Sequence, residues 1–277
     1  MHEIGGDFEV EPGALELDSI VDTCDGEADV TWYSSGRMAL KAILRVLPHG
    51  VFLVPSYLCD AVLQPFRELN VPFRFYTIET DLRFDVAGLR RMCGSDVVGV
   101  LHIDLFGVQP DAEREAFLAG LVDDGLCVIT DITHSYPGLA DFRDRAGTHI
   151  VCSVRKTLPL PDGAFVVTRG AHPQQPTLPA GGYVGDKLQA QVEKYRYLYG
   201  EAPRAFLPAL RSAEAGFEQD VEIRSPSAVS RQLFRTIDLH AAGVARRRNF
   251  SQLLSESAGG FNAVAPLLNY LPEAGSP

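Results

Sequence analysis

The sequence predicts an α/β fold, a three-layer sandwich in which helices cover both faces of a mainly parallel sheet. Short apolar runs rich in β-branched residues recur between Ser34 and Thr168. Several of these runs are separated by stretches in which apolar residues follow helical spacing. Continuous apolar strands that alternate with helices are typical of a parallel sheet buried on both faces.

The expected strands are five apolar runs: VFLV at 51–54, VVGVLHI at 97–103, LCVIT at 126–130, IVCSV at 150–154 and AFVVT at 164–168. Helical spacing is clearest in two groups of apolar residues: Met38, Leu40, Ile43, Leu44 and Leu47, and then Phe117, Leu118, Leu121 and Val122. These elements account for the first two thirds of the chain.

The composition and the expected secondary structure change after Thr168. Residues 170–183 are rich in Gly, Pro and Gln, which predicts a loop, and helical stretches are expected at 185–199, 204–217 and 227–256. The sequence therefore predicts an N-terminal segment (1–30), a large domain (31–220) and a reduced, mostly helical C-terminal part (221–277).

The charge and the cysteines exclude several classes of protein. A formal net charge of −11 opposes binding to nucleic acid or to an anionic membrane surface. The five cysteines are scattered and form no C-x-x-C pair, which favours reduced thiols. No signal peptide and no apolar run long enough to span a membrane is found, so we expect a cytoplasmic protein.

Three polar features follow strands at the edge where a parallel sheet carries its functional residues. The stretch SSGR, with Ser34 or Ser35 as N-cap and Gly36 in the first turn, opens a helix whose free N–H groups could bind an anion. Asp131 follows the LCVIT strand, and Lys156 follows IVCSV. Taken singly, each is explained as well by a helix cap, a turn or a solvated charge, but their joint order indicates one site.

That order resembles the fold type I enzymes that depend on pyridoxal 5′-phosphate (PLP), and more narrowly the DegT/DnrJ/EryC1/StrS group of sugar aminotransferase-like proteins. The resembling stretches are IGGDFEVEP, SSGRMALKAIL, VFLVPSYLCDAVLQPF, ETDLRFDVAGL, GVLHIDLFG, VITDITHSYPG and SVRKTLPLPDGAFVVT, with a fainter similarity at SAVSRQLFRTIDLHAAGVARRRNFSQLL. The resemblance implies an aspartate aminotransferase-like large domain.

The resemblance also implies a role for each matching residue. Lys156 would form a Schiff base with PLP and shuttle a proton, while Asp131 would pair with the pyridine nitrogen. The phosphate would be bound by Ser35, Gly36 and Arg37, together with Ser153. His134 would bond to the ring oxygen, and Thr133 would lie against one face of the ring. Tyr57, or Cys59 in its place, would stack on the other face. Ser153 and Lys156 are three residues apart, where many of these relatives have five.

By resemblance the chain is an aminotransferase that passes an amino group, from glutamate or glutamine, to a keto-sugar or a small keto compound. Such enzymes are usually homodimers with small-molecule substrates. Because the C-terminal part is short, a non-catalytic or regulatory PLP-binding homologue that partners a full-length enzyme is the alternative.

Two other readings are weaker. The Ser153-x-x-Lys156 spacing also occurs in penicillin-recognising enzymes, but their S-D-N and K-T-G signatures are absent. His102, Asp104, Asp131 and His134 could be written as metal ligands, but they form two separated pairs. We therefore expect no metal.

Overall fold

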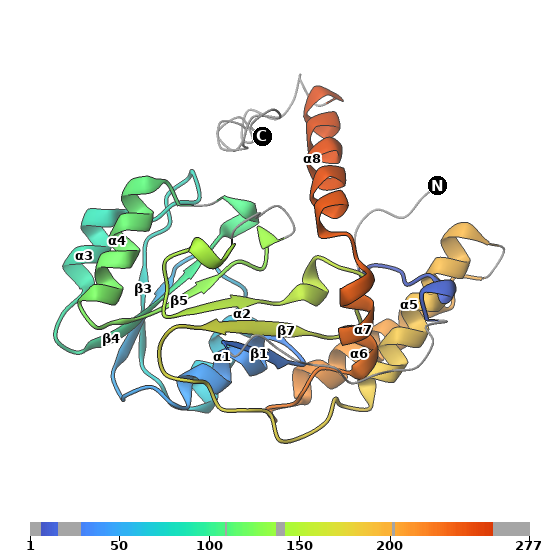
Figure 1. Cartoon of the computed structure of the whole chain (residues 1–277), viewed down its shortest axis with the longest axis horizontal. Coiled ribbons are helices and arrows are strands. Elements are labelled where there is room, and N and C mark those ends of the chain that lie inside the picture. Colours follow the sequence, from blue (N-terminus) through green and yellow to red (C-terminus); the bar gives the residue numbers. More distant parts are fainter. Residues whose placement is uncertain (1–6, 16–28, 109, 137–141, 201–202, 257–277) are drawn as a thin grey trace.

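A single seven-stranded sheet organises the molecule. The computed structural model describes residues 7–15, 29–108, 110–136, 142–200 and 203–256. The strands are β1 (Val30–Tyr33), β2 (Val51–Pro55), β3 (Phe73–Tyr76), β4 (Val97–Ile103), β5 (Cys127–Asp131), β6 (His149–Cys152) and β7 (Ala164–Thr168). Their order across the sheet is β1-β7-β6-β5-β4-β2-β3 (Figure 1).

Most of the pairing is parallel. The ladders β6-β5, β5-β4, β4-β2 and β2-β3 are parallel, whereas β7 is antiparallel to both β6 and β1. Two successive reversals return β1 to the direction of β2 through β6. The carboxyl end of β1 therefore reaches the same sheet edge as the carboxyl ends of β4, β5 and β6.

Eight α-helices surround the sheet in the described part of the chain: α1 (Gly36–Leu44), α2 (Asp60–Glu68), α3 (Val86–Met92), α4 (Ala112–Asp123), α5 (Tyr183–Tyr199), α6 (Phe206–Gln219), α7 (Ala228–Thr236) and α8 (Leu239–Glu256). Short 3₁₀ turns include η1 (Pro12–Leu15), η2 (Leu105–Gly107), η4 (Phe142–Asp144) and η5 (Val154–Lys156). None of these described helices is long and apolar enough to cross a membrane.

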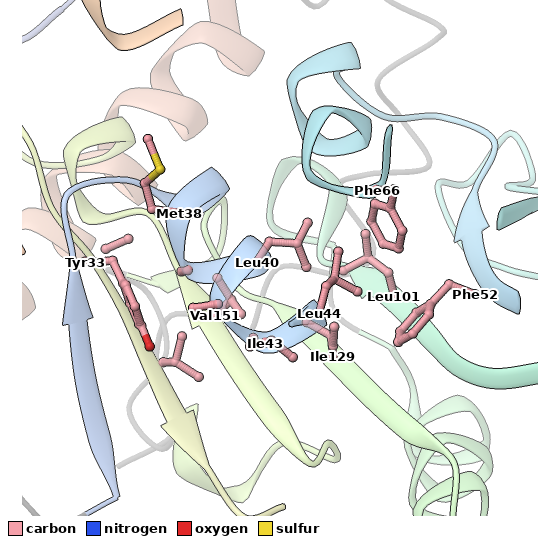
Figure 2. Close-up of a cluster of buried hydrophobic side chains, with 14 of the residues drawn as sticks. Tyr33, Met38, Leu40, Ile43, Leu44, Phe52, Phe66, Leu101, Ile129 and Val151 are labelled. Carbon is pink, nitrogen blue, oxygen red and sulfur yellow. The ribbon is translucent and has the colours of Figure 1, made fainter. Parts of the chain in front are cut away.

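Alternation along the strands creates a core on each face. On one face, α1 and α2 pack on Val54, Leu101 and Val151, with Ile43 and Phe66 fully buried (Figure 2). Complete burial of an aliphatic side chain contributes about 1.5–3 kcal/mol, so this layer anchors α1 firmly on the sheet.

The opposite face carries two further clusters. Near β4 and β5 the α3 and α4 side chains Leu89 and Leu118 pack on Val100 and Val128. Near β6 and β7 the partners come from α5 and α7, among them Leu233. The predicted three-layer α/β architecture with a mainly parallel sheet is confirmed.

The prediction of a single C-terminal helix at 227–256 is wrong. The segment is divided into α7 and α8 at Ile237 and Asp238, where Ile237 is extended (φ −78°, ψ 123°) and the Asp238 carboxylate caps the new helix by accepting from Ala241 N at 2.8 Å. Figure 1 shows α8 standing away from the body of the molecule. Residues 1–6, 16–28 and 257–277, which hold much of the predicted terminal segments, lie outside the described residues.

Candidate active site

The start of α1 faces the sheet edge where β1 and β6 end. Ser35 is extended (φ −154°), and its Oγ accepts from Met38 N at 3.4 Å, so Ser35 rather than Ser34 is the N-cap. The first α-helical bond runs from Ala39 N to Ser35 O. The N–H groups of Gly36 and Arg37 precede that bond, so they have no acceptor within the helix and can bind an anion.

Ser153, at the end of β6, packs against this helix start. A Cβ added to Gly36 would lie 3.2 Å from the Ser153 Cβ and 3.6 Å from its Oγ. The approach requires glycine or a local shift at position 36. Sequence positions more than a hundred residues apart thus meet at the predicted phosphate site.

The Arg37 side chain is engaged elsewhere. Its guanidinium donates to Gln64 Oε1 at 2.5 Å and to the Phe217 carbonyl of α6. Burial and the nearby positive charge of Arg155 lower the pKa of Arg37. Arg37 would therefore bind an anion at the helix start through its backbone N–H and not through its guanidinium.

Asp131 ends β5 and connects to the helix start through hydrogen bonds. Its Oδ1 accepts from Thr133 N at 2.8 Å, and Thr133 Oγ1 accepts from Ser153 N at 2.9 Å. Burial raises the pKa of Asp131, although the hydrogen bonds from Thr133 oppose that rise. No lysine or arginine of the described residues forms an ion pair with this carboxylate.

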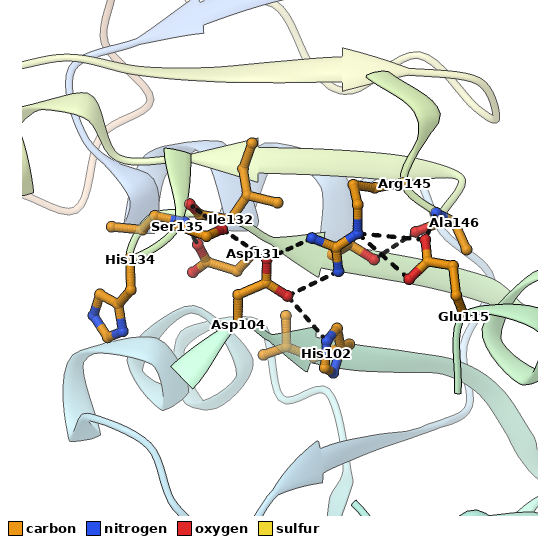
Figure 3. Close-up of polar contacts among 12 residues, drawn as sticks. His102, Asp104, Glu115, Asp131, Ile132, His134, Ser135, Arg145 and Ala146 are labelled. Carbon is orange, nitrogen blue, oxygen red and sulfur yellow. Dashed lines mark hydrogen bonds and ion pairs between the residues drawn. The ribbon is translucent and has the colours of Figure 1, made fainter. Parts of the chain in front are cut away.

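Asp104, at the end of the neighbouring strand, is satisfied in a different way (Figure 3). Its fully buried carboxylate accepts from Arg145 Nη1 at 2.5 Å and Nη2 at 2.8 Å, from Ser135 Oγ at 2.7 Å, and contacts His102 Nε2 at 3.2 Å. Burial alone would raise the pKa of Asp104, but the bonds from Arg145 and His102 lower it to about 2. His102 and Asp104 thus belong to this network.

The metal reading gains no support here. No group of three His, Cys, Asp or Glu side chains suited to a metal occurs in the part of the chain that the structure describes.

An exposed row of aromatic side chains lies beyond Asp131. His134 Nδ1 accepts from Phe106 N at 3.1 Å, and the two rings stack with centroids 5.8 Å apart. Tyr57 lies 6.1 Å from Phe106 and is 55% exposed. Phe106 has a positive φ of 53°, a conformation that a phenylalanine seldom adopts. His134 and Tyr57 therefore share an exposed surface with Phe106, which the sequence did not single out.

Lys156 differs from the other lysines of the chain. The sequence has four, and Lys41, Lys187 and Lys194 are almost fully buried. Each of those three amines donates to a carboxylate or a carbonyl. The Lys156 side chain, at the end of η5, is exposed, and its amine makes no hydrogen bond or ion pair to any described residue, while the backbone N donates to Ser153 O at 3.1 Å. Desolvation of the amine by the neighbouring protein atoms, followed by the charge of Arg155, lowers the pKa of Lys156 even though its side chain is exposed.

Four charged residues form a network beside Lys156 that the sequence did not predict. Arg155 Nη1 donates to Glu214 Oε1 at 3.1 Å, and the same oxygen accepts from Lys187 of α5. Lys187 also pairs with Asp7 Oδ1 at 3.0 Å. A sequence signal did exist: Lys187, Gln191 and Lys194 place polar groups along the buried stripe of α5.

The structure therefore brings Asp131, Thr133, Ser153, Ser35 and Gly36 into one contiguous chain of contacts. Lys156 follows Ser153 by three residues. The Ser153 and Lys156 side chains share no hydrogen bond, so the serine-hydrolase reading gains no contact from the structure. The cofactor roles given to these residues, and to His134 and Tyr57, stay predictions.

No protein-family model matches the sequence, and no curated protein matches it either. Solved structures do match. DesI, crystallised with its TDP-sugar product, is 18% identical, and the match covers 84% of this chain and 54% of DesI with a TM-score of 0.53. A DegT DnrJ EryC1 StrS aminotransferase from Brucella abortus is 16% identical, and the match covers 83% of this chain and 59% of that one with a TM-score of 0.52. Spr1654 from Streptococcus pneumoniae, in its PLP form, matches at 13% (92% and 67%, TM-score 0.55). The chain spans little more than half the length of DesI. These likenesses confirm the expected fold, that of fold type I PLP enzymes.

Proposed function

We propose that this protein is a PLP-dependent aminotransferase that passes an amino group to a keto-sugar or a small keto compound. The observation that carries the proposal is the arrangement at one sheet edge. A lysine whose amine has no partner among the described residues, a half-buried carboxylate without a lysine or arginine partner and a helix start with free N–H groups lie at the ends of β6, β5 and β1. Solved structures of the same fold include a DegT DnrJ EryC1 StrS aminotransferase and Spr1654, described as a putative sugar aminotransferase. The homodimer expected for that group belongs to the proposal.

The residues present fit the cofactor. The N–H groups of Gly36 and Arg37, beside Ser35 and Ser153, would hold the phosphate, because an anion is stabilised at the positive end of a helix. Gly36 leaves the close approach to Ser153 that a Cβ would fill. When bound, PLP supplies an electron sink for a carbanion at the amine-bearing carbon.

Asp131 supplies a fixed negative charge. A carboxylate whose pKa is raised by burial gains most from a cationic hydrogen-bond donor placed beside it. A protonated pyridine nitrogen is such a donor, and Thr133 N already orients one carboxylate oxygen. Asp131 would thus keep a proton on the ring nitrogen.

Lys156 would hold the cofactor and later move a proton. An amine must be neutral to attack an aldehyde or to accept a proton. The lowered pKa of Lys156 increases its neutral fraction at neutral pH, and its freedom from hydrogen bonds leaves the lone pair available.

The test is a titration of the protein with PLP. Wild-type protein should develop the absorbance of a protonated Schiff base near the visible edge, and Lys156→Ala should not. Lys156→Arg is the matched control, because it keeps the positive charge but cannot form the bond. A band of equal size in either variant contradicts the assignment of Lys156.

The second candidate is a non-catalytic PLP-binding homologue that partners a full-length enzyme. The chain spans 54% of the length of DesI, so likeness to DesI does not carry the activity of that whole enzyme to this chain. Addition of glutamate or glutamine to the loaded protein separates the two. An aminotransferase converts the Schiff-base band to that of the aminated cofactor, and the non-catalytic homologue leaves the band unchanged.

A further inference from the structure

The turn that follows β4 holds Phe106 in a conformation that phenylalanine seldom adopts. Phe106 has φ 53° and ψ 21°, and Gly107 has a φ of 87°. Positive φ at two successive central residues is the geometry of a type I′ turn, in which Gly, Asn and Asp are the usual residues. Val108 N closes this turn by donating to the Leu105 carbonyl at 2.9 Å. The phenylalanine at position 106 is therefore held against its own backbone preference.

The two residues before Phe106 keep the turn in place. Asp104 is fully buried, its N–H donates to the Asp131 carbonyl at 3.0 Å, and its own carbonyl accepts from Gly107 N at 3.1 Å. Leu105 is buried in the hydrophobic cluster of α1 and α2. Because the packed part of the fold fixes these neighbours, it also supports the strain at Phe106. Strain supported in this way is typical of functional positions.

The Phe106 side chain gains little from burial, since the residue is 62% exposed. Core packing is therefore not the reason for a strained aromatic residue here. Its closest interactions are with His134: the Phe106 N–H donates to His134 Nδ1 at 3.1 Å, and the two rings stack at 23° with centroids 5.8 Å apart. The turn thus presents a backbone donor and a ring face to the same imidazole.

The backbone donor determines which nitrogen of His134 carries the proton. A neutral imidazole has one N–H donor and one acceptor nitrogen. Since Nδ1 accepts from Phe106 N, the ring proton lies on Nε2. Turning the ring over would place a carbon against the Phe106 N–H and lose the bond. Nε2 forms no hydrogen bond to any described residue, and His134 is exposed, so this N–H is available to a ligand.

We propose that Phe106 is a positioning residue that fixes His134 as the Nε2–H tautomer and so makes it a hydrogen-bond donor. The use of this donor rests on the proposed function, in which His134 would bond to the ring oxygen of PLP. That oxygen is an acceptor when it is ionised, and an N–H donor stabilises its charge. The other tautomer would place a lone pair against it. Phe106 acts through His134 and does not touch the reacting atoms.

The experiment is NMR of the whole chain without PLP, labelled with ¹⁵N in histidine and phenylalanine, at about pH 8, above the usual titration range of histidine. His134→Gln identifies the His134 signals. The ring ¹⁵N shifts report which nitrogen carries the proton, and a correlation across the hydrogen bond joins Phe106 N to His134 Nδ1. We expect the proton on Nε2 and a visible correlation.

Two substitutions at Phe106 separate the backbone donor from the aromatic ring. Phe106→Gly keeps the N–H and adopts positive φ readily, whereas Phe106→Val keeps a side chain but disfavours positive φ. Phe106→Gly should keep the correlation and bind PLP within about threefold of wild type, because the hydrogen bond to His134 is retained. Phe106→Val should lose the correlation and bind PLP about tenfold more weakly, the scale of one lost hydrogen bond.

Phe75→Ala is the matched control, because Phe75 is another exposed phenylalanine, on the edge strand β3. It should leave the His134 signals and PLP affinity unchanged. A proton on Nδ1 of the wild type, or an unchanged correlation in Phe106→Val, overturns the proposal. Unchanged PLP affinity in a Phe106→Val protein that has lost the correlation overturns the use of the tautomer in cofactor binding.

The NMR spectra are recorded without PLP, so they are independent of the Schiff-base titration. A protein with the proton on Nε2 that forms no Schiff base keeps the tautomer assignment and loses the proposed function. A protein that forms the Schiff base with the proton on Nδ1 keeps the proposed function and loses the tautomer assignment.

Discussion

Asp104 and Asp131 lie at the ends of neighbouring strands, but only the Asp104 carboxylate has a cationic partner. Asp104 N donates to Asp131 O at 3.0 Å, so the two residues are adjacent. Two nitrogens of the Arg145 guanidinium donate to the Asp104 carboxylate, whereas the Asp131 carboxylate accepts hydrogen bonds only from Thr133. The pKa of Asp104 falls and that of Asp131 rises. Burial without a cation is costly, so an unpaired carboxylate beside a paired one indicates a place kept for a ligand.

The lysines repeat this contrast. Lys187 is buried and held by Asp7 and Glu214, while the side-chain amine of Lys156, near it in space, is exposed and makes no hydrogen bond or ion pair with a described residue. In each pair one member stabilises the fold and the other is left available for chemistry.

The largest effect is expected at Arg145. Arg145→Met leaves the Asp104 carboxylate buried with only His102 and Ser135, and the loss of one partner of a buried pair costs about 3–5 kcal/mol of unfolding free energy. Urea unfolding at pH 7 measures it. The double variant with Asp104→Asn should recover most of the loss; if it is no more stable than Arg145→Met, the two residues do not act as a pair.

Asp131→Asn should reduce turnover but not stability, in contrast to Arg145→Met. The amide oxygen can still accept from Thr133 N, so stability at pH 7 should equal or exceed that of the wild type, because the raised pKa of Asp131 makes its ionised form unfavourable in the fold. Turnover should fall about a hundredfold, the scale of a lost charge-assisted hydrogen bond of about 3 kcal/mol. Steady-state kinetics together with urea unfolding tests both halves, and a large loss of stability would make Asp131 a structural residue like Asp104.

Acid unfolding should depend on Asp104. The pKa of Asp104 is about 2 in the folded protein, against about 3.9 when unfolded, so its contribution of about 2.6 kcal/mol is complete above about pH 5 and is lost as the pH falls through 2. The slope of unfolding free energy between pH 5 and pH 3 should be shallower in Asp104→Asn. An unchanged slope would mean that other carboxylates dominate acid unfolding.

The smallest effect is expected at Arg155. Its charge helps to lower the pKa of Lys156, so Arg155→Met should raise that pKa and reduce the neutral amine at pH 7.5 by about threefold, which corresponds to half a pKa unit. The rate of Schiff-base formation with PLP, followed from pH 6 to pH 10, measures the shift. If the profile moves toward lower pH, the charge argument is wrong.

The sequence predicted the main strands and the start of α1 because their signals are local. VVGVLHI and AFVVT are continuous apolar runs, and Ser35 caps the helix that follows it. Strand β3 was missed because FRFY is a short edge strand with two exposed residues, a pattern shared with loops. The break before α8 had a signal in Asp238, an N-cap residue, which helical periodicity concealed.

The site was predicted less completely than the fold. Asp131 and Lys156 follow strands, so their positions at one edge could be expected from topology. The pairing of Lys187 with Asp7 and Glu214 joins segments up to 180 residues apart, and the same is true of the Arg37 contact with the Phe217 carbonyl. Contacts of that range depend on how α5 and α6 pack, which no local pattern encodes.

The most direct test of the contrast between occupied and available groups is to locate the covalent attachment of PLP. The protein is incubated with PLP, reduced with borohydride and digested, and the four lysines are compared by peptide mass spectrometry. We expect a pyridoxyl group on Lys156 and almost none on Lys41, Lys187 or Lys194. Labelling spread over the buried lysines, or absent from Lys156, would contradict it.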